Sequence, residues 1–377
     1  MAALFSPLTI RGTTFRNRLW VSPLCQYSVE NGDGVPTDWH LVHLGSFAIG
    51  GAGLVMTEAT AVSDIGRISP QDTGLFNGEQ RDAWARIVNF VRGQGAVAGI
   101  QLAHAGRKAS TWRPWGLADG TVPLADGGWQ SVAPSAIPFT GYATPRALTL
   151  GEIAEVIEQF VAAARLAVEA GFEVLEVHAA HGYLLHEFLS PLANARTDDY
   201  GGSLENRARL LLEIVAAIRV AVGGSIPVFV RFSATDWAEK RHPENEREAF
   251  QSWDVEQTTT VAGWARDAGA DLFDISTGGL ISGVSIPVGP GYQVPFAAQI
   301  HRGAAVPVNA VGLITTAQQA EDIVARGDAD AIMMGRQMMR DPHFAWRAAA
   351  ELGVELDYYP PQYLRARYRL SEFDRLA

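Results

Sequence analysis

Eight short apolar runs, rich in β-branched residues, constrain the fold of this chain more than any other feature. They span residues 18–24, 53–59, 97–104, 172–179, 227–234, 271–278, 306–312 and 331–336. Amphipathic segments that predict helices lie between them, most clearly over 151–171, 203–223 and 315–327, and each of these three ends in glycine. Alternating strands and helices predict a parallel sheet with crossover helices, and eight strands are the number that closes a (β/α)8 barrel.

The alternative is an open, doubly wound sheet, which normally carries a glycine-rich turn after its first strand. The segment that follows the first run, "SPLCQYS" at 22–28, contains no glycine. We therefore predict a single α/β domain, a TIM barrel, over residues 1–377. A short hairpin at 8–15 is expected to close the end of the barrel opposite the active site.

One long insertion interrupts the alternation after the third strand. Residues 106–149 are rich in Gly, Pro and Trp, and loops of this length are usually functional, often as lids. Because the insertion follows a strand, it is expected on the catalytic face of the barrel. Its tryptophans Trp112, Trp115 and Trp129 either cover a flat ligand or anchor the loop to the barrel, and the sequence leaves both alternatives open.

Composition excludes several classes of partner. The formal net charge of -11 argues against nucleic acid or an anionic membrane as a partner, so a phosphate ligand must be held by local groups. The single cysteine, Cys25, excludes a disulfide or a cysteine cluster within one chain. The N-terminus lacks the pattern of a signal peptide, and no apolar stretch is long enough for a membrane span, so we expect a cytoplasmic protein.

Polar residues stand where the predicted strands end, which is where barrel enzymes place their chemistry. Arg231 lies inside an apolar run, where a guanidinium is costly without an anionic partner. The last two strands each lead to glycine, at Gly312 and at Gly335, which precedes Arg336. Glycine lets backbone N–H groups approach a ligand, and the loops after strands seven and eight often form a phosphate site in this fold.

The segment "EVHAAHGYLLHEFLSPL" at 176–192 carries the densest group of ionisable side chains. Strand parity places Glu176 and His178 on one face, with His181 and Tyr183 in the following turn. The histidine pair lacks the third ligand of a zinc site, so we predict no metal. Two imidazoles and a phenol are instead good donors to a substrate oxygen, while His186 and the neighbouring glutamate are expected to be structural.

Four segments resemble one known family. The segment "VHAAHGYLLHEFLSPLANARTDDYGGSLENR" at 177–207 is similar to the signature of the old yellow enzyme family, FMN-dependent ene-reductases on an eight-stranded barrel. "SPLCQYS" at 22–28, "IQLAHAGRKAS" at 100–110 and "MMGRQMMRDP" at 333–342 also resemble that family, in the same order along nearly the whole chain. The cysteine and the "HAGRK" run look like the thermophilic-like branch.

The resemblance implies FMN as cofactor, NADPH or NADH as reductant, and a small activated alkene as substrate. It implies that His178 and His181 bind the substrate oxygen, that Tyr183 donates a proton to one alkene carbon while reduced flavin delivers hydride to the other, and that Tyr27 contacts the substrate. Cys25 would lie near the flavin and tune its redox potential. The residues that it assigns to the flavin ring, ribityl chain and phosphate are Ser22, Pro23, Leu24, Cys25, Ala59, Gln101, Arg231, Gly312, Gly335 and Arg336.

Two regions bear on substrate choice and assembly. Val311 stands where some family members carry a bulky aromatic residue, which leaves the pocket shape open. The tail at 352–377 contains "YYPPQYLRARYR" at 358–369, which resembles tails that reach a neighbouring subunit's active site, with Arg365 at the position of such an arginine. A homo-oligomer is therefore expected, and the alternative is a basic tail that serves its own subunit. The cysteine cluster of larger, iron-sulfur-containing relatives is absent from the sequence.

Overall fold

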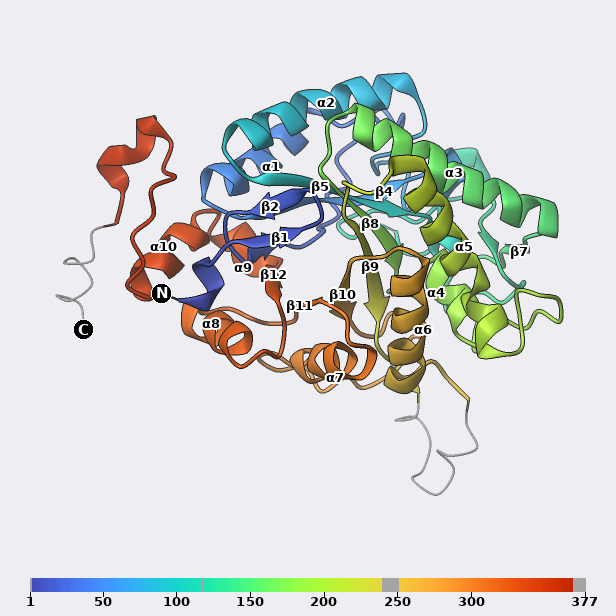
Figure 1. Ribbon diagram of the computed structural model, residues 1–377. Coiled ribbons are helices and arrows are strands. Elements are labelled where there is room, and N and C mark those ends of the chain that lie inside the picture. Colours follow the sequence, from blue (N-terminus) through green and yellow to red (C-terminus); the bar gives the residue numbers. More distant parts are fainter. Residues whose placement is uncertain (1, 117, 239–250, 369–377) are drawn as a thin grey trace.

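A computed structural model describes residues 2–116, 118–238 and 251–368. Eight parallel strands close into a barrel in their order along the chain (Figure 1). They are β3 Leu19–Val21, β4 Leu54–Ala61, β5 Val97–Ala103, β8 Val174–Ala179, β9 Val228–Ser233, β10 Leu272–Ser276, β11 Val308–Ala310 and β12 Ala331–Met334. Each lies within one of the eight apolar runs or overlaps it closely, so the predicted TIM barrel is confirmed.

Helices follow the strands and surround the barrel. The outer ring consists of α1 Asp38–Ile49, α2 Gly78–Gly93, α3 Leu150–Glu169, α5 Leu204–Val222, α6 Val255–Ala268, α7 Val294–Ala304, α8 Ala317–Ala325 and α10 Phe344–Glu351. The three helices predicted from amphipathic spacing are α3, α5 and α8. Helix α3 begins with a capping box, in which the Thr149 hydroxyl accepts from the Glu152 N–H and the Glu152 carboxylate accepts from the Thr149 N–H. Two short helices, α4 Leu184–Leu189 and α9 Arg336–Arg340, follow β8 and β12.

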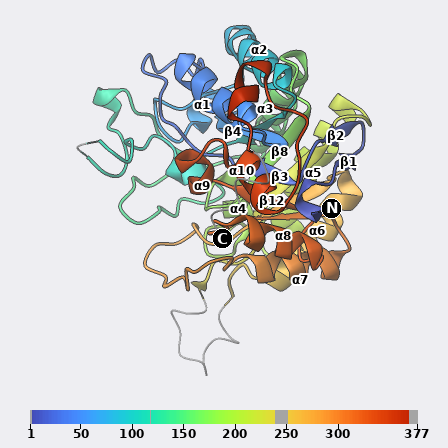
Figure 2. The same cartoon turned by 90° about the vertical axis from the view of Figure 1, so that its left-hand side faces the viewer.

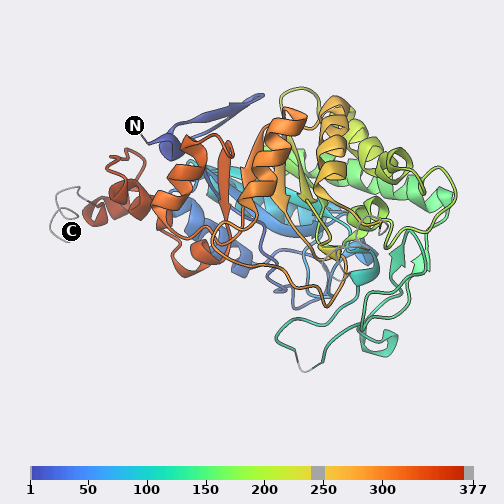
Figure 3. The ribbon, with the colours of Figure 1, turned by 90° about the horizontal axis from the view of Figure 1, so that it is seen from below.

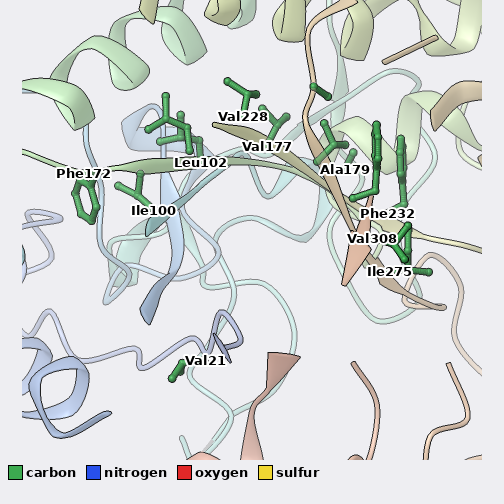
Figure 4. Close-up of a cluster of buried hydrophobic side chains, with 14 of the residues drawn as sticks. Val21, Ile100, Leu102, Phe172, Val177, Ala179, Val228, Phe232, Ile275 and Val308 are labelled. Atoms are coloured by element: carbon green, nitrogen blue, oxygen red, sulfur yellow. The ribbon is translucent and has the colours of Figure 1, made fainter. Parts of the chain in front are cut away.

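The outer face of the barrel packs against these helices. Apolar side chains such as Ile100, Val177, Ala179 and Ile275 point outward from their strands into one continuous buried cluster (Figure 4). Each fully buried side chain of the size of valine to phenylalanine contributes about 1.5–3 kcal/mol. Because side chains alternate along a strand, the residues between these positions point into the barrel. The outward positions therefore stabilise the fold and leave the inward positions free for other uses.

The hairpin and the insertion lie at opposite ends of the barrel (Figure 3). Strands β1 Leu8–Ile10 and β2 Thr13–Phe15 pair antiparallel, as predicted, and pack on a second apolar cluster at the amino ends of the barrel strands. The insertion stands out from the helical ring (Figure 2). It contains short 3-10 turns at Gly106–Lys108 and Leu124–Asp126 and a small parallel sheet of β6 Val132–Ala133 and β7 Arg146–Ala147.

The C-terminal tail leaves α10 and turns back onto it. A 3-10 helix spans Pro361–Ala366, and the rings of Tyr359 and Tyr363 pack on Trp346 at centroid distances of 4.7 and 5.7 Å. Arg365 is exposed in the single chain. The end of the predicted tail, 369–377, lies outside the described residues. Among the helices that the structure describes, none combines the length and apolarity needed to cross a bilayer.

Candidate active site

Most of the predicted site residues line two cavities at the carboxyl ends of the strands. We call the first the glycine cavity, and its lining includes Ser22, Pro23, Leu24, Arg231, Ser276, Val311, Gly312, Gly335, Arg336 and Arg340. We call the second the aromatic cavity, and its lining includes Tyr27, Ile68, Lys108, Trp112, Phe139, Tyr142 and Tyr183. The other predicted residues lie in barrel strands, at Ala59, Gln101 and His178, or in the segments that follow strands, at Cys25 and His181.

The glycine cavity combines positive charge with close backbone approach. Arg336 and Arg340 have no ion-pair partner within the described part of the chain, although the chain as a whole is acidic. Gly312 has φ of +119°, and a Cβ there would lie 2.8 Å from the side-chain nitrogen Nε2 of Gln293. Helix α9 starts at Arg336 without a side-chain cap, which leaves its first amides available. These features suit the phosphate end of a ligand.

A polar layer crosses the barrel interior between the two ends. Gln101 Nε2 donates to Glu176 Oε1 at 2.8 Å, and Arg231 Nε lies 2.9 Å from Asp274 Oδ2. Burial raises the pKa of both carboxyl groups, and for Glu176 the nearby Asp274 carboxylate raises it further, whereas Arg231 opposes the rise. The unpartnered buried atoms around this layer include Glu176 Oε2, Asp274 Oδ1, His178 Nδ1 and both amide atoms of Asn309, counted over the residues described. Such atoms suit a bound heterocycle with donors and acceptors at its edge.

The two predicted histidines meet at the mouth of the barrel. His178 lies on β8, and His181 follows in a turn with φ of +59°. Their ring nitrogens His178 Nε2 and His181 Nδ1 are 3.4 Å apart, and His181 Nε2 lies 2.7 Å from the Ser276 hydroxyl. Burial, followed by the positive charge of Arg231, lowers the pKa of both imidazoles well below its usual value. Both rings are therefore neutral, and each carries one N–H.

Lys108 holds the strained backbone at His181. A non-glycine residue in the left-handed region needs support from its surroundings. The Lys108 ammonium donates to the His181 carbonyl at 2.8 Å and to the Gly279 carbonyl, and the His181 N–H donates to Ser233 Oγ at 2.9 Å. A Cβ on Gly279 would lie 2.6 Å from His181 Cα, so only glycine allows this approach. Burial and the neighbouring Arg107 lower the pKa of Lys108 to about 8.

Tyr183 lies beside the histidine pair. Its ring centroid is 5.2 Å from that of His178, and its hydroxyl makes no hydrogen bond with any residue in the described ranges. Burial raises the pKa of this phenol, so it holds its proton at neutral pH. Tyr183 also packs in one apolar cluster with Cys25, Tyr27 and Ala59. Burial, with the carboxylates of Asp72 and Glu58, raises the pKa of the Cys25 thiol, so it is neutral and poorly suited to act as a nucleophile.

The tryptophans of the insertion do not all have the same role: one anchors the loop to the barrel, and two lie at or near the aromatic cavity. Trp129 anchors the loop, because its indole N–H donates to the Ile65 carbonyl at 2.9 Å and Arg67 lies 5.2 Å from its ring. Trp112 lines the aromatic cavity. Trp115 is 61% exposed and meets Tyr27, which lines that cavity, edge-on at 5.7 Å.

The residues expected to be structural have protein partners. His186 Nδ1 accepts from the Gly182 N–H at 2.9 Å, and its Nε2 lies 3.0 Å from Asp236. Glu187 accepts from the Arg107 N–H at 2.9 Å, and burial raises its pKa to about 8. No group of three or more side chains of His, Cys, Asp or Glu that could hold a metal occurs within the residues described.

Comparison with known proteins agrees with this geometry. The profile of the NADH:flavin oxidoreductase / NADH oxidase family matches residues 3–355. This chain belongs to that family. It is 47% identical to an NADPH dehydrogenase of Listeria monocytogenes serotype 4a over 367 residues, covering 97% of this chain and 99% of the relative. An NADPH dehydrogenase of Geobacillus is 44% identical over 354 residues, covering 94% and 95% of the two chains.

Solved structures support the same family, known as the old yellow enzymes. The fold matches morphinone reductase with a TM-score of 0.75 and 28% identity, covering 95% of this chain and 92% of that one. It also matches a 2-naphthoyl-CoA reductase with a TM-score of 0.82 and 27% identity over 93% of this chain, but only 52% of that longer chain. The protein is therefore an FMN-dependent oxidoreductase that uses NAD(P)H. The glycine cavity and the unpartnered polar layer fit the two ends of that cofactor.

Sequence reasoning missed Lys108, Asp274 and Ser276. Asp274 and Ser276 alternate on β10 as Glu176 and His178 do on β8, so the same parity rule would have placed them inside the barrel. Lys108 carried no comparable signal, because its partners lie far away in the sequence.

Proposed function

We propose that this old yellow enzyme reduces activated C=C bonds, in α,β-unsaturated carbonyl or nitro compounds. One observation carries the proposal. His178 Nε2 and His181 Nδ1 converge at 3.4 Å beside the Tyr183 hydroxyl, which has no hydrogen-bond partner among the described residues. Two neutral imidazole N–H groups aimed at one point stabilise the negative charge that develops on a substrate oxygen during addition to the alkene.

The cofactor would lie across the carboxyl ends of the strands. When bound, FMN supplies a two-electron carrier that NADPH or NADH can reduce and an alkene can reoxidise. Arg231 would face its ring, held by Asp274 at 2.9 Å, and would favour negative charge there. Gln101 would also contact the ring, together with the Ser22–Cys25 segment and Ala59. Gly312, Gly335 and Arg336 would hold the phosphate.

The substrate would occupy the space between the histidine pair and the aromatic cavity. Tyr183 holds its proton because burial raises its pKa, and its position beside His178 allows it to donate to the carbon next to the activating group. Tyr27 and Trp112 would flank a flat substrate from the insertion side, which makes residues 106–149 a lid anchored by Trp129. Val311 lines the glycine cavity and would shape its floor.

The test separates the two half-reactions. The purified holoenzyme is reduced with NADPH without oxygen and then mixed with 2-cyclohexenone, while the flavin absorbance is followed. We expect the enone to restore the oxidised spectrum with formation of cyclohexanone. Reoxidation by oxygen but not by the enone or a nitroalkene would refute the assignment and leave an NADPH oxidase.

The tail supports a second, separate proposal on assembly. Arg365 is exposed, lines neither cavity of its own chain, and lies in a segment that also exposes Leu364 and Tyr368. We propose a homo-oligomer in which Arg365 reaches the substrate cavity of a neighbour. Arg365→Ala should then raise KM for the enone in an assembly of unchanged size, whereas an unchanged KM would show that the tail serves only its own subunit.

A further inference from the structure

The two nitrogens of the His181 ring have different surroundings. Nδ1 faces His178 Nε2 at 3.4 Å, and Nε2 faces the Ser276 hydroxyl at 2.7 Å. A neutral imidazole carries its proton on only one of these nitrogens. The position of that proton decides what the histidine pair can do.

In one of the two tautomers of His181, the two histidines would hydrogen-bond to each other instead of to a substrate. With the proton on Nε2, the bare Nδ1 of His181 could accept from the N–H at His178 Nε2, and no second donor would remain for a substrate oxygen. With the proton on Nδ1 of His181, and with His178 protonated on Nε2, the two N–H groups point at the same space and cannot bond each other. The function proposed above therefore needs the second tautomer.

The Ser276 hydroxyl has two candidate acceptors for its proton. Its hydroxyl lies 2.7 Å from His181 Nε2 and 3.3 Å from Gln293 Oε1. Gln293 Oε1 already accepts from the Thr277 hydroxyl at 2.9 Å, and Gln293 Nε2 donates to the Val311 carbonyl at 3.0 Å, which sets the orientation of the amide. The shorter and less contested acceptor is His181 Nε2, which can accept only when it carries no proton.

The backbone that carries the His181 ring is held on both sides. Ser233 holds the backbone N–H of His181, and Lys108 holds its carbonyl. Ser276 is 5% exposed and lies on β10, which only β9 separates from β8 and the turn that carries His181. The hydroxyl is thus fixed on one side of the ring and the histidine partner on the other.

We propose that Ser276 is a positioning residue that keeps His181 in the Nδ1–H tautomer, so that both histidines donate to the substrate oxygen. The inference rests on the proposed clamp for its purpose, but the tautomer itself can be measured without any substrate. Ser276 also lines the glycine cavity, so its variants must be compared at equal FMN content.

The experiment uses holoenzyme labelled with 15N-histidine. Long-range 1H–15N spectra distinguish the two tautomers, and the His181 signals are assigned by their loss in His181→Ala. We expect Nδ1–H at His181 in the unmodified enzyme, a shift toward Nε2–H in Ser276→Ala, and recovery in Ser276→Thr. Thr277→Val leaves Gln293 Oε1 free to compete for the Ser276 hydroxyl and should give a smaller shift in the same direction.

Ligand binding gives a second readout. Affinity for phenol, followed by the change in flavin absorbance, should fall roughly tenfold or more in Ser276→Ala and recover in Ser276→Thr. An Nε2–H tautomer in the unmodified enzyme, or an unchanged tautomer in Ser276→Ala, would overturn the proposal. A tautomer shift in an enzyme that does not reduce enones would leave this inference standing and refute the proposed function alone.

Discussion

The two ends of the barrel use the same strands for opposite purposes. At the amino ends, Val174, Phe229 and Leu272 point inward and pack with Phe15 of the hairpin in an apolar cluster. Two residues further along the same three strands, the inward positions are Glu176, Arg231 and Asp274. Beyond these come His178, Ser233 and Ser276. A step of two residues along a strand therefore separates a core from a site.

This difference separates the residues that stabilise the fold from the residues that serve the candidate site. The closed end gains free energy from apolar burial, whereas the open end carries buried charges and unpartnered polar atoms that cost free energy until a ligand satisfies them. Substitutions at the closed end should therefore change stability and spare chemistry, and those at the open end should do the reverse. The following predictions test that division.

The largest effect is expected at Tyr183. Removing its hydroxyl in Tyr183→Phe removes the proposed proton donor, so reoxidation of the reduced enzyme by 2-cyclohexenone should slow about 10²–10⁴-fold. Reduction by NADPH should change little. Tyr142→Phe is the matched control, because that hydroxyl lines the same cavity but bonds Thr111 at 3.1 Å. Equal losses in both half-reactions, measured by stopped-flow absorbance, would remove Tyr183 as the donor.

The next effect is on stability at the closed end. Phe229 is fully buried, and its ring lies 5.9 Å from Trp20 and 6.4 Å from Phe15. Phe229→Ala should lower the free energy of unfolding by about 3–5 kcal/mol through lost burial and a cavity. Denaturant unfolding measures this loss, and Val220→Ala, at an 86% exposed position, is the control. A large change in phenol affinity in folded Phe229→Ala would break the division between the ends.

A smaller, pH-dependent effect is expected at Lys108. Its folded pKa of about 8 lies below the usual 10.5, so the ammonium loses its proton as the pH rises through 8. The positive charge clamps the carbonyls of His181 and Gly279, and its surroundings are Arg107, Glu187 and the rings of Phe139 and Tyr183. KM for 2-cyclohexenone should therefore rise, roughly tenfold at most, as the pH increases above 8.

Two variants check this explanation. Lys108→Met should show the raised KM at every pH, and Lys108→Arg should keep the low KM across the range because arginine stays charged. Burial disfavours the charged form of Lys108 in the folded state, so between pH 8 and 10.5 the unfolded chain binds more protons than the folded chain. The contribution of Lys108 to the free energy of unfolding therefore rises with pH over this range. A KM that follows global unfolding would contradict the clamp.

The smallest effect is expected in the helical ring, away from both ends of the barrel. Thr149→Ala removes the capping box of α3 and should cost about 1 kcal/mol of unfolding free energy without changing either half-reaction. Thermal unfolding and steady-state kinetics measure the two quantities. A kinetic change would show that the helical ring and the open end are coupled.

Local sequence patterns were sufficient to predict the barrel and several of the side chains that point into it. Eight apolar runs alternating with amphipathic segments determined the barrel, because strand and helix periods are local properties of the chain. Parity within residues 172–179 placed Glu176 and His178 inward, and the same rule holds on β10 for Asp274 and Ser276.

Other features depended on the tertiary structure. Lys108 contacts carbonyls that are 73 and 171 residues away in the sequence, and the strained turn at His181 exists because those contacts support it. The 2.7 Å approach of Ser276 to His181 spans 95 residues. Periodicity reports which face of an element a side chain occupies, but closure of the barrel decides which faces meet. The sequence by itself thus determined the barrel and its polar mouth, and only the folded chain determined which donor faces which acceptor there.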